Sequence, residues 1–166
     1  MNDYQKKRFT EKIVGKMFNT VTGKKIAILG YAFKKDTGDV RETPSMFVVR
    51  DLLQEQANIH IFDPEVKRED MWIEMDYTCH VNHTNTPGLD KSVTTSPDAY
   101  SACDGAHAIC VLTEWDCFKD LDYTRIFKSM ADGFLAEFGS ALEAAEAGLS
   151  IQRAMAGYNA DRPADR

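Results

Sequence analysis

The feature that most constrains the fold of this sequence is a short apolar run that ends at a glycine. Residues 26–29 read Ile-Ala-Ile-Leu and are followed by Gly30. A run of this length, bounded by a turn residue, is typical of a buried strand in a parallel sheet. Thr43 and Pro44 then favour a helix start, because threonine caps the first free amides and proline fits the first helical position. The stretch predicts a strand, a loop and a helix, in that order.

The loop between this strand and this helix is cationic. It carries Lys34, Lys35 and Arg41, and it leads into a helix N-terminus with unpaired N–H groups and a partial positive charge. Together these features predict a site for an anion such as a nucleotide phosphate. The dinucleotide fingerprint is absent, since Ala32 and Lys35 stand where its second and third glycines belong, and no Walker sequence follows. Taken alone, the loop fits an ordinary strand-to-helix turn with solvated lysines equally well.

Further apolar stretches extend this unit into an open sheet. After a helix over about 44–56, residues 58–64 predict a second strand that ends at a proline, which completes a βαβ unit with parallel strands. Residues 65–91 suggest only one or two helical turns and a surface loop. Further strands are expected at 92–95, 106–112 and 133–138, and a helix is expected at 122–130. The predicted fold class is α/β, a Rossmann-like, mostly parallel sheet with helices on both faces.

Polar residues follow two of the predicted strands at their carboxyl ends, the edge where open α/β sheets hold ligands. Asp63 lies further from Gly30 than the spacing of about 20 residues expected of an acid that binds a ribose. We therefore interpret Asp63 first as a turn residue and second as a ligand contact. The other cluster, residues 113–116, reads Thr-Glu-Trp-Asp, and Trp115 there can equally well cover the core.

Composition limits the partners of the chain. Its 166 residues carry a net charge of −6 at pH 7, which argues against a broad nucleic-acid or anionic-membrane surface. We expect neither a signal peptide nor a membrane span, and the four cysteines form no Cys-x-x-Cys pair. Reduced thiols in a cytoplasmic protein are the simplest interpretation. Cys79, His80 and His83 resemble part of a metal site, but no second pair of ligands stands nearby, so we expect no metal.

Several long motifs, in this order, resemble one known family. They are NDYQKKRF, NTVTGKKIAILGYAFKKDTGDVRET, IHIFDP and YSACDGAHAICVLTEWDCFKDLDY. Over roughly residues 2–130 the chain resembles the C-terminal, UDP-binding domain of UDP-glucose 6-dehydrogenases of the eukaryotic type. The resemblance implies a full-length homo-oligomeric enzyme that oxidises UDP-glucose to UDP-glucuronate with NAD⁺, through a covalent intermediate on a cysteine.

The same resemblance assigns site residues. It implies that Phe33 and Lys34 contact the UDP-sugar and that Arg41 reaches NAD, which is bound mainly by another domain. The family's catalytic cysteine, in a Gly-Gly-x-Cys-type segment, and its glycine-rich NAD-binding strand are not in these residues. We therefore expect no catalytic residue in this chain and no turnover by it alone.

The resemblance also sets domain bounds. It implies the end of a central inter-domain helix in residues 1–22 and a UDP-binding domain in 23–158, and the polar residues 159–166 predict a disordered tail. After about residue 130 the chain departs from the family, which continues into a strand ending Phe-Asp-Gly-Arg, whose arginine helps bind UDP. Here no arginine follows before Arg153, and losing that contact would weaken binding about ten- to a hundredfold.

Two other functions remain open from the sequence. The chain is compatible with a non-catalytic, truncated paralogue that serves as an interaction or dimerisation module. It is also compatible with another nucleotide-sugar dehydrogenase, such as the GDP-mannose type, because residues outside this segment largely decide which sugar is bound.

Overall fold

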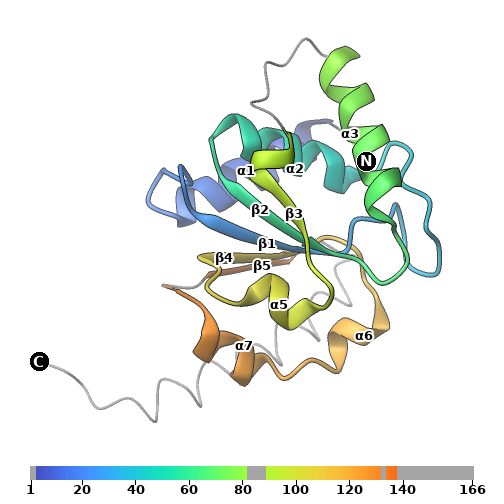
Figure 1. Cartoon of the computed structure of the whole chain (residues 1–166). Coiled ribbons are helices and arrows are strands. Elements are labelled where there is room, and N and C mark those ends of the chain that lie inside the picture. Colours follow the sequence, from blue (N-terminus) through green and yellow to red (C-terminus); the bar gives the residue numbers. More distant parts are fainter. Residues whose placement is uncertain (1–2, 82–88, 132–133, 138–166) are drawn as a thin grey trace, which may run out of the picture.

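A parallel sheet forms the centre of the fold (Figure 1). The computed structural model describes residues 3–81, 89–131 and 134–137, and its five strands lie in the order β3-β2-β1-β4-β5. The strands are β1 Lys25–Leu29, β2 Asn58–Phe62, β3 Val93–Thr95, β4 Ala108–Val111 and β5 Phe134–Glu137. Each neighbouring pair is parallel, which confirms the predicted α/β, Rossmann-like fold.

Helices cover both faces of this sheet, as predicted. Figure 1 shows α1, α2 and α3 on one face and α5, α6 and α7 on the other. The helices are α1 Asp3–Lys16, α2 Pro44–Gln54, α3 Arg68–Val81, α4 Leu89–Ser92, α5 Ala99–Cys103, α6 Asp116–Lys119 and α7 Tyr123–Ser129. Because β1 lies at the centre between the two helical layers, its residues 26–29 are fully buried.

The α2 helix begins where the sequence predicts. Thr43 is the N-cap residue, its side-chain Oγ1 accepts a hydrogen bond from the Ser45 amide at 3.3 Å, and Pro44 occupies the first helical position. The buried side of the helix, which includes Met46, Val49 and Leu52, packs into the core. The cationic loop is therefore held between a central strand and a firmly packed helix.

The α1 helix packs against α2. Its buried residues Phe9 and Ile13, with Met17 just after its end, join the main core. The Lys24 ammonium group donates a hydrogen bond to the Met17 carbonyl at 2.9 Å and so ties the helix end to the start of β1. The domain bounds at 22 and 158 stay a prediction, and residues 138–166 lie outside the described part of the chain.

The α3 helix is longer than the sequence suggested. We expected one or two helical turns, but α3 spans 14 residues. Met71 and Met75, one turn apart, are buried against the core, and the Arg68 guanidinium lies 4.1 Å from the centre of the Trp72 ring. Two buried methionines are a weak periodic signal, which is why the sequence pattern underestimates the helix. Among the described residues, no helix has the length and apolar character needed to cross a membrane.

Candidate functional site

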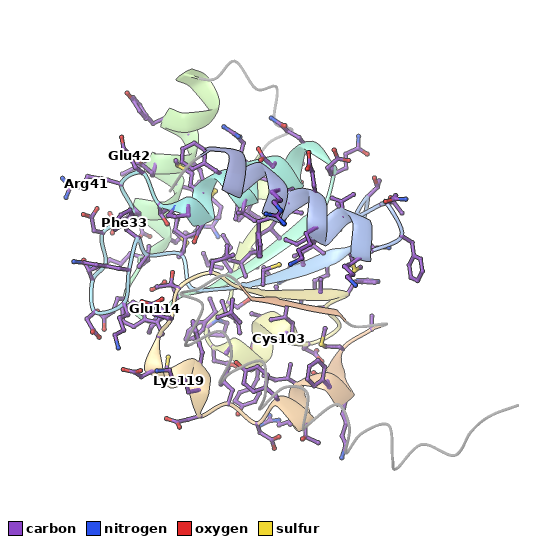
Figure 2. All side chains as sticks on the ribbon, turned by 180° about the vertical axis from the view of Figure 1, so that it is seen from behind. Phe33, Arg41, Glu42, Cys103, Glu114 and Lys119 are labelled. Carbon is purple, nitrogen blue, oxygen red and sulfur yellow. The ribbon has the colours of Figure 1, made fainter. Side chains whose placement is uncertain are left out.

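The loop that follows β1, residues 30–43, lies at the carboxyl edge of the sheet. Figure 2 shows Phe33, Arg41 and Glu42 of this loop at the same end of the molecule as Glu114 and Lys119, which follow β4. The ends of β1 and β4 meet there because the two strands are parallel neighbours in register, with Leu29 opposite Val111. The candidate site is therefore built from loops that are far apart in the sequence.

Gly30 allows these two loops to touch. Its φ of +87° lies in the left-handed region, and a Cβ atom built on it would lie 2.5 Å from the Cβ and 2.7 Å from the amide nitrogen of Thr113. No side chain fits in that space, so only glycine permits this contact. The loop after β1 thus rests directly on the chain that leaves β4.

The carbonyl groups at the start of the loop are all bound by hydroxyl groups. The carbonyls of residues 30–32 accept hydrogen bonds from Ser45 at 3.4 Å, from Thr43 at 2.9 Å and from Thr113 at 2.7 Å, respectively. The three donors come from the start of α2 and the end of β4. These bonds fix the path of the backbone up to Phe33.

Asp63, at the carboxyl end of β2, fixes the amides of the same segment. Its side chain is 9% exposed, and its Oδ1 accepts hydrogen bonds from the Glu65 and Val66 amides at 2.9 and 3.0 Å. Its Oδ2 accepts hydrogen bonds from the Tyr31 amide at 2.6 Å, the Ala32 amide at 3.0 Å and the Trp115 Nε1 at 3.1 Å. The interpretation of Asp63 as a turn residue is confirmed, and its long-range bonds to the loops after β1 and β4 are a finding that the sequence did not predict.

The N-terminus of α2 differs from the prediction. We expected its free N–H groups to help bind an anion, but the chain itself uses them. The Ser45 amide donates to the Thr43 hydroxyl, the Met46 amide donates to the Thr43 carbonyl at 3.2 Å, and Pro44 has no N–H. Binding of an anion at this edge therefore depends on the side chains of the loop.

The Arg41 guanidinium group forms a bidentate ion pair with Asp39 of the same loop. Its Nε and one terminal nitrogen donate to the two Asp39 carboxylate oxygens at 2.9 and 2.7 Å, while 81% of the Arg41 side chain is exposed. The hydrogen bonds from Arg41 lower the pKa of Asp39 to about 2. The guanidinium group is oriented but has a carboxylate partner already.

Lys35 is also paired. Its ammonium group lies 3.3 Å from one Asp116 oxygen, and Lys119 lies 2.9 Å from the other. The hydrogen bonds from Lys119, and next from Lys35, lower the pKa of Asp116. This exposed pair links the loop after β1 to α6.

Phe33 and Lys34 are exposed residues of the loop whose side chains have no such carboxylate partner. Phe33 is 51% exposed, although its amide donates to the Asp39 carbonyl at 2.8 Å and closes the loop over residues 33–39. Lys34 is exposed and makes no ion pair with any residue that the structure describes. The loop therefore presents an aromatic ring and a free ammonium group side by side in sequence.

Comparison with known proteins identifies the family. The model of the UDP-glucose/GDP-mannose dehydrogenase family, UDP binding domain, matches residues 27–144. The chain belongs to this family. The predicted resemblance is thereby confirmed for a UDP-binding domain.

Longer proteins similar in sequence to this UDP-binding domain include UDP-glucose 6-dehydrogenases. The chain is 52% identical over 130 residues to that of Pongo abelii, and 50% identical over 137 residues to UDP-glucose 6-dehydrogenase 5 of Oryza sativa subsp. japonica. The matches cover 78% of this chain but 26% and 28% of those proteins. The chain thus spans about a quarter of the length of the relatives it matches.

Solved structures show the same fold. A UDP-glucose dehydrogenase from the hyperthermophilic archaeon Pyrobaculum islandicum superimposes with a TM-score of 0.59 at 24% identity, over 87% of this chain and 28% of that one. The NDP-N-acetyl-D-galactosaminuronic acid dehydrogenase from Methanosarcina mazei Go1 gives a TM-score of 0.54 at 25% identity, over 76% of this chain and 22% of that one. These likenesses support the Rossmann-like architecture of the UDP-binding domain.

The described cysteines of this UDP-binding domain are poorly suited to act as nucleophiles. Cys103, Cys110 and Cys117 are free thiols. Burial raises the pKa of Cys103 and of Cys110 to about 12. The pKa of Cys117, at the surface, is also raised, by partial desolvation of its thiol and by the negative charge of neighbouring carboxylates. A thiol reacts as its thiolate, which these environments disfavour. Within the described residues no group of three histidine, cysteine or acidic side chains is placed to hold a metal, and the side chains of Cys79, His80 and His83 lie outside the part that is described.

Proposed function

We propose that this chain binds the UDP part of UDP-glucose through the loop after β1, as the UDP-binding domain of an NAD-dependent UDP-glucose 6-dehydrogenase. Membership of the UDP-binding domain family supports the ligand class. Identity of about half to enzymes named UDP-glucose 6-dehydrogenase supports the sugar. The domain supplies binding, and the oxidation belongs to the longer protein.

The unpaired charge of Lys34 carries this proposal. Of the three cations in the loop, Lys35 and Arg41 already have carboxylate partners, whereas Lys34 is exposed and has none among the described residues. An ammonium group that needs no carboxylate to be displaced is the best donor for a phosphate oxygen. The neighbouring Phe33 ring, half exposed, offers an apolar surface for the remainder of the UDP-sugar.

We extend the proposal to Arg41 as a contact for NAD. The residues described here do not fit a dinucleotide site of their own, because Ala32 and Lys35 replace two fingerprint glycines and the Asp63 oxygens are occupied. The resemblance to UDP-glucose 6-dehydrogenases implies instead that Arg41 contacts an NAD molecule bound mainly by another domain. The N–H groups of Arg41 that Asp39 does not bind can donate to phosphate or amide oxygens, and Asp39 keeps the guanidinium group oriented.

Titration calorimetry of this chain with UDP tests the assignment. We expect Lys34→Ala to weaken UDP binding about ten- to a hundredfold, the effect of one lost charge-assisted hydrogen bond. Lys128→Ala, which removes an exposed charge from α7, is the matched control and should bind UDP as the wild type does. Uridine, which has no phosphate, should bind the wild type and Lys34→Ala equally. An unchanged UDP affinity in Lys34→Ala would remove the site assignment.

Two further measurements separate the alternatives. Competition of UDP-glucose with GDP-mannose tests the sugar-nucleotide class, and we expect UDP-glucose to win. Sedimentation tests the interaction-module alternative, which requires self-association without nucleotide binding. We expect no formation of NADH from UDP-glucose and NAD⁺ by this chain alone.

A cytoplasmic location and a homo-oligomeric full-length enzyme complete the proposal. The free thiols of the described cysteines support the cytoplasmic location.

A further inference from the structure

Asp63 joins the loops that follow three strands. Its carboxylate holds the start of the loop after β1 through two amides, its own turn after β2 through two more, and the chain after β4 through the Trp115 indole. These donors come from positions that are up to 52 residues away in the sequence. The side chain is almost completely buried, so the bonds are protected from water.

We propose that Asp63 is a positioning residue of the nucleotide site, which fixes the direction in which Phe33 and Lys34 leave the sheet. The inference rests on the proposed function, since it names a residue that controls the same site. Tyr31 and Ala32, whose amides Asp63 binds, immediately precede Phe33. A change at Asp63 should therefore shift the backbone immediately before Phe33 and Lys34, the proposed ligand contacts.

The site requires a carboxylate in particular. Each Asp63 oxygen faces at least two N–H donors, two at Oδ1 and three at Oδ2. An asparagine has one oxygen and one NH₂ group, so in either orientation its NH₂ group faces donors and cannot accept from them. Asp63→Asn thus keeps the shape of the side chain while it releases one set of bonds.

The same bonds leave Asp63 unavailable to the ribose of a dinucleotide. In dinucleotide-binding folds an acid in this region of the sheet edge accepts hydrogen bonds from ribose hydroxyls. Here the acceptor positions of Asp63 are taken by the protein, so this edge offers no acid to an adenosine ribose. We expect the wild-type chain to bind UDP in preference to NAD⁺.

The sign of the effect distinguishes positioning from simple electrostatics. Asp63 is an acid near a site for an anion, so removing its charge should strengthen UDP binding if charge alone mattered. Loss of positioning predicts the opposite, a weaker affinity for UDP. The two explanations therefore differ in direction and not only in size.

Asp63→Asn and Asp98→Asn make a matched pair for calorimetry with UDP. Asp98 caps α5 on the other face of the sheet and accepts hydrogen bonds from the Ser101 amide and hydroxyl, each at 2.8 Å, so both variants lose one acidic charge and some stability. We expect Asp63→Asn to weaken UDP binding by about tenfold or more and Asp98→Asn to leave it unchanged. Equal or stronger UDP binding by folded Asp63→Asn would overturn the proposal.

Amide exchange supplies a readout that does not need UDP. We expect the amides of residues 31–39 to exchange faster in Asp63→Asn than in the wild type, while Ile26 and Ile28 in β1 stay protected. A wild-type chain that does not bind UDP would contradict the proposed function. The positioning role has a separate test: it would be contradicted if the amides of residues 31–39 exchanged at the same rate in Asp63→Asn and in the wild type. Trp115→Phe removes one of the five donors to Asp63 and replaces Asp63→Asn if that variant does not fold. We expect it to weaken UDP binding and to speed amide exchange in residues 31–39, each by less than Asp63→Asn would.

Discussion

Gly30 and Thr113 are packed so closely that a Cβ atom on Gly30 would lie 2.5 Å from the Cβ of Thr113. This contact joins the end of the central strand to the segment that follows β4. It also combines two separate reasons for a glycine, the left-handed φ of +87° and the lack of space. The two reasons can be separated by experiment, because Gly105 has the first without the second.

Gly30→Ala should destabilise the chain far more than Gly105→Ala. Gly105 has a φ of +64°, and nothing lies within 4 Å of the place that a Cβ atom would take, so alanine there should cost about 1 kcal/mol of backbone strain. At Gly30 the overpacking against Thr113 adds about 1–3 kcal/mol. Urea unfolding of both variants measures the difference, and equal losses of stability would show that the contact with Thr113 relaxes without cost.

Thr43→Ala should cost about 2–3 kcal/mol, more than an ordinary N-cap replacement. The buried Thr43 hydroxyl accepts from the Ser45 amide and donates to the Tyr31 carbonyl at 2.9 Å, so alanine leaves both groups without this partner. Asp122→Ala, at the exposed cap of α7, is the control and should cost about 1 kcal/mol. Thr43→Ser keeps the hydroxyl and should restore most of the stability measured by urea unfolding. A Thr43→Ser variant as unstable as Thr43→Ala would mean that the methyl group, and not the hydroxyl, matters.

Arg41→Ala should raise the pKa of Asp39 from about 2 toward its ordinary value of 3.8. Because the pKa is depressed in the folded state, the ion pair stabilises the fold above the ordinary pKa, and this contribution disappears as the pH falls through about 2. NMR titration of the Asp39 carboxyl group measures the shift. Asp98, whose pKa is lowered by hydrogen bonds from Ser101, should titrate identically in both proteins. If Asp39 in Arg41→Ala still titrated near 2, another group would have to hold it ionised.

Thiol labelling should separate the described cysteines. In a Cys79→Ser background, we expect a thiol reagent to modify Cys117 in the native state, slowly at neutral pH and faster as the pH rises, because its pKa is raised. Cys103 and Cys110 are buried with a pKa of about 12 and should react only after unfolding. Rapid modification of Cys103 or Cys110 in native protein at neutral pH would contradict the structure.

The sequence was sufficient for elements whose signals are local. The strands at β1 and β2 follow from apolar runs bounded by a glycine and a proline, and the start of α2 follows from Thr43 and Pro44. In each case the residues that define the element lie within a few positions of one another. The parallel pairing of β1 with β2 then follows from the βαβ pattern.

Interactions between distant residues were not predictable in this way. The partners of Asp63 include Trp115, and the partner of Lys35 is Asp116, 81 positions away. The use of the amides at the start of α2 by Thr43 is, in contrast, a local interaction that follows from the predicted cap. The cationic nature of the loop was visible in the sequence, but which cations are paired was decided by folding.

The roles of Phe33, Lys34 and Arg41 came from the family resemblance rather than from residue patterns. The structure adds a reason to separate them, since Arg41 has a carboxylate partner and Lys34 does not. Asp39 lies two positions before Arg41, and the structure shows that it is this partner. These three assignments stay predictions until binding is measured.

The central position of β1 has a consequence for the order in which a newly synthesised chain can fold. β1 pairs with β2, about 30 residues downstream, but its other edge pairs with β4, whose Ala108 is 82 residues after Ile26. Until the ribosome has released β4, the most buried strand presents an open, apolar edge. Chains shortened before residue 108 should therefore aggregate rather than form a smaller, stable sheet.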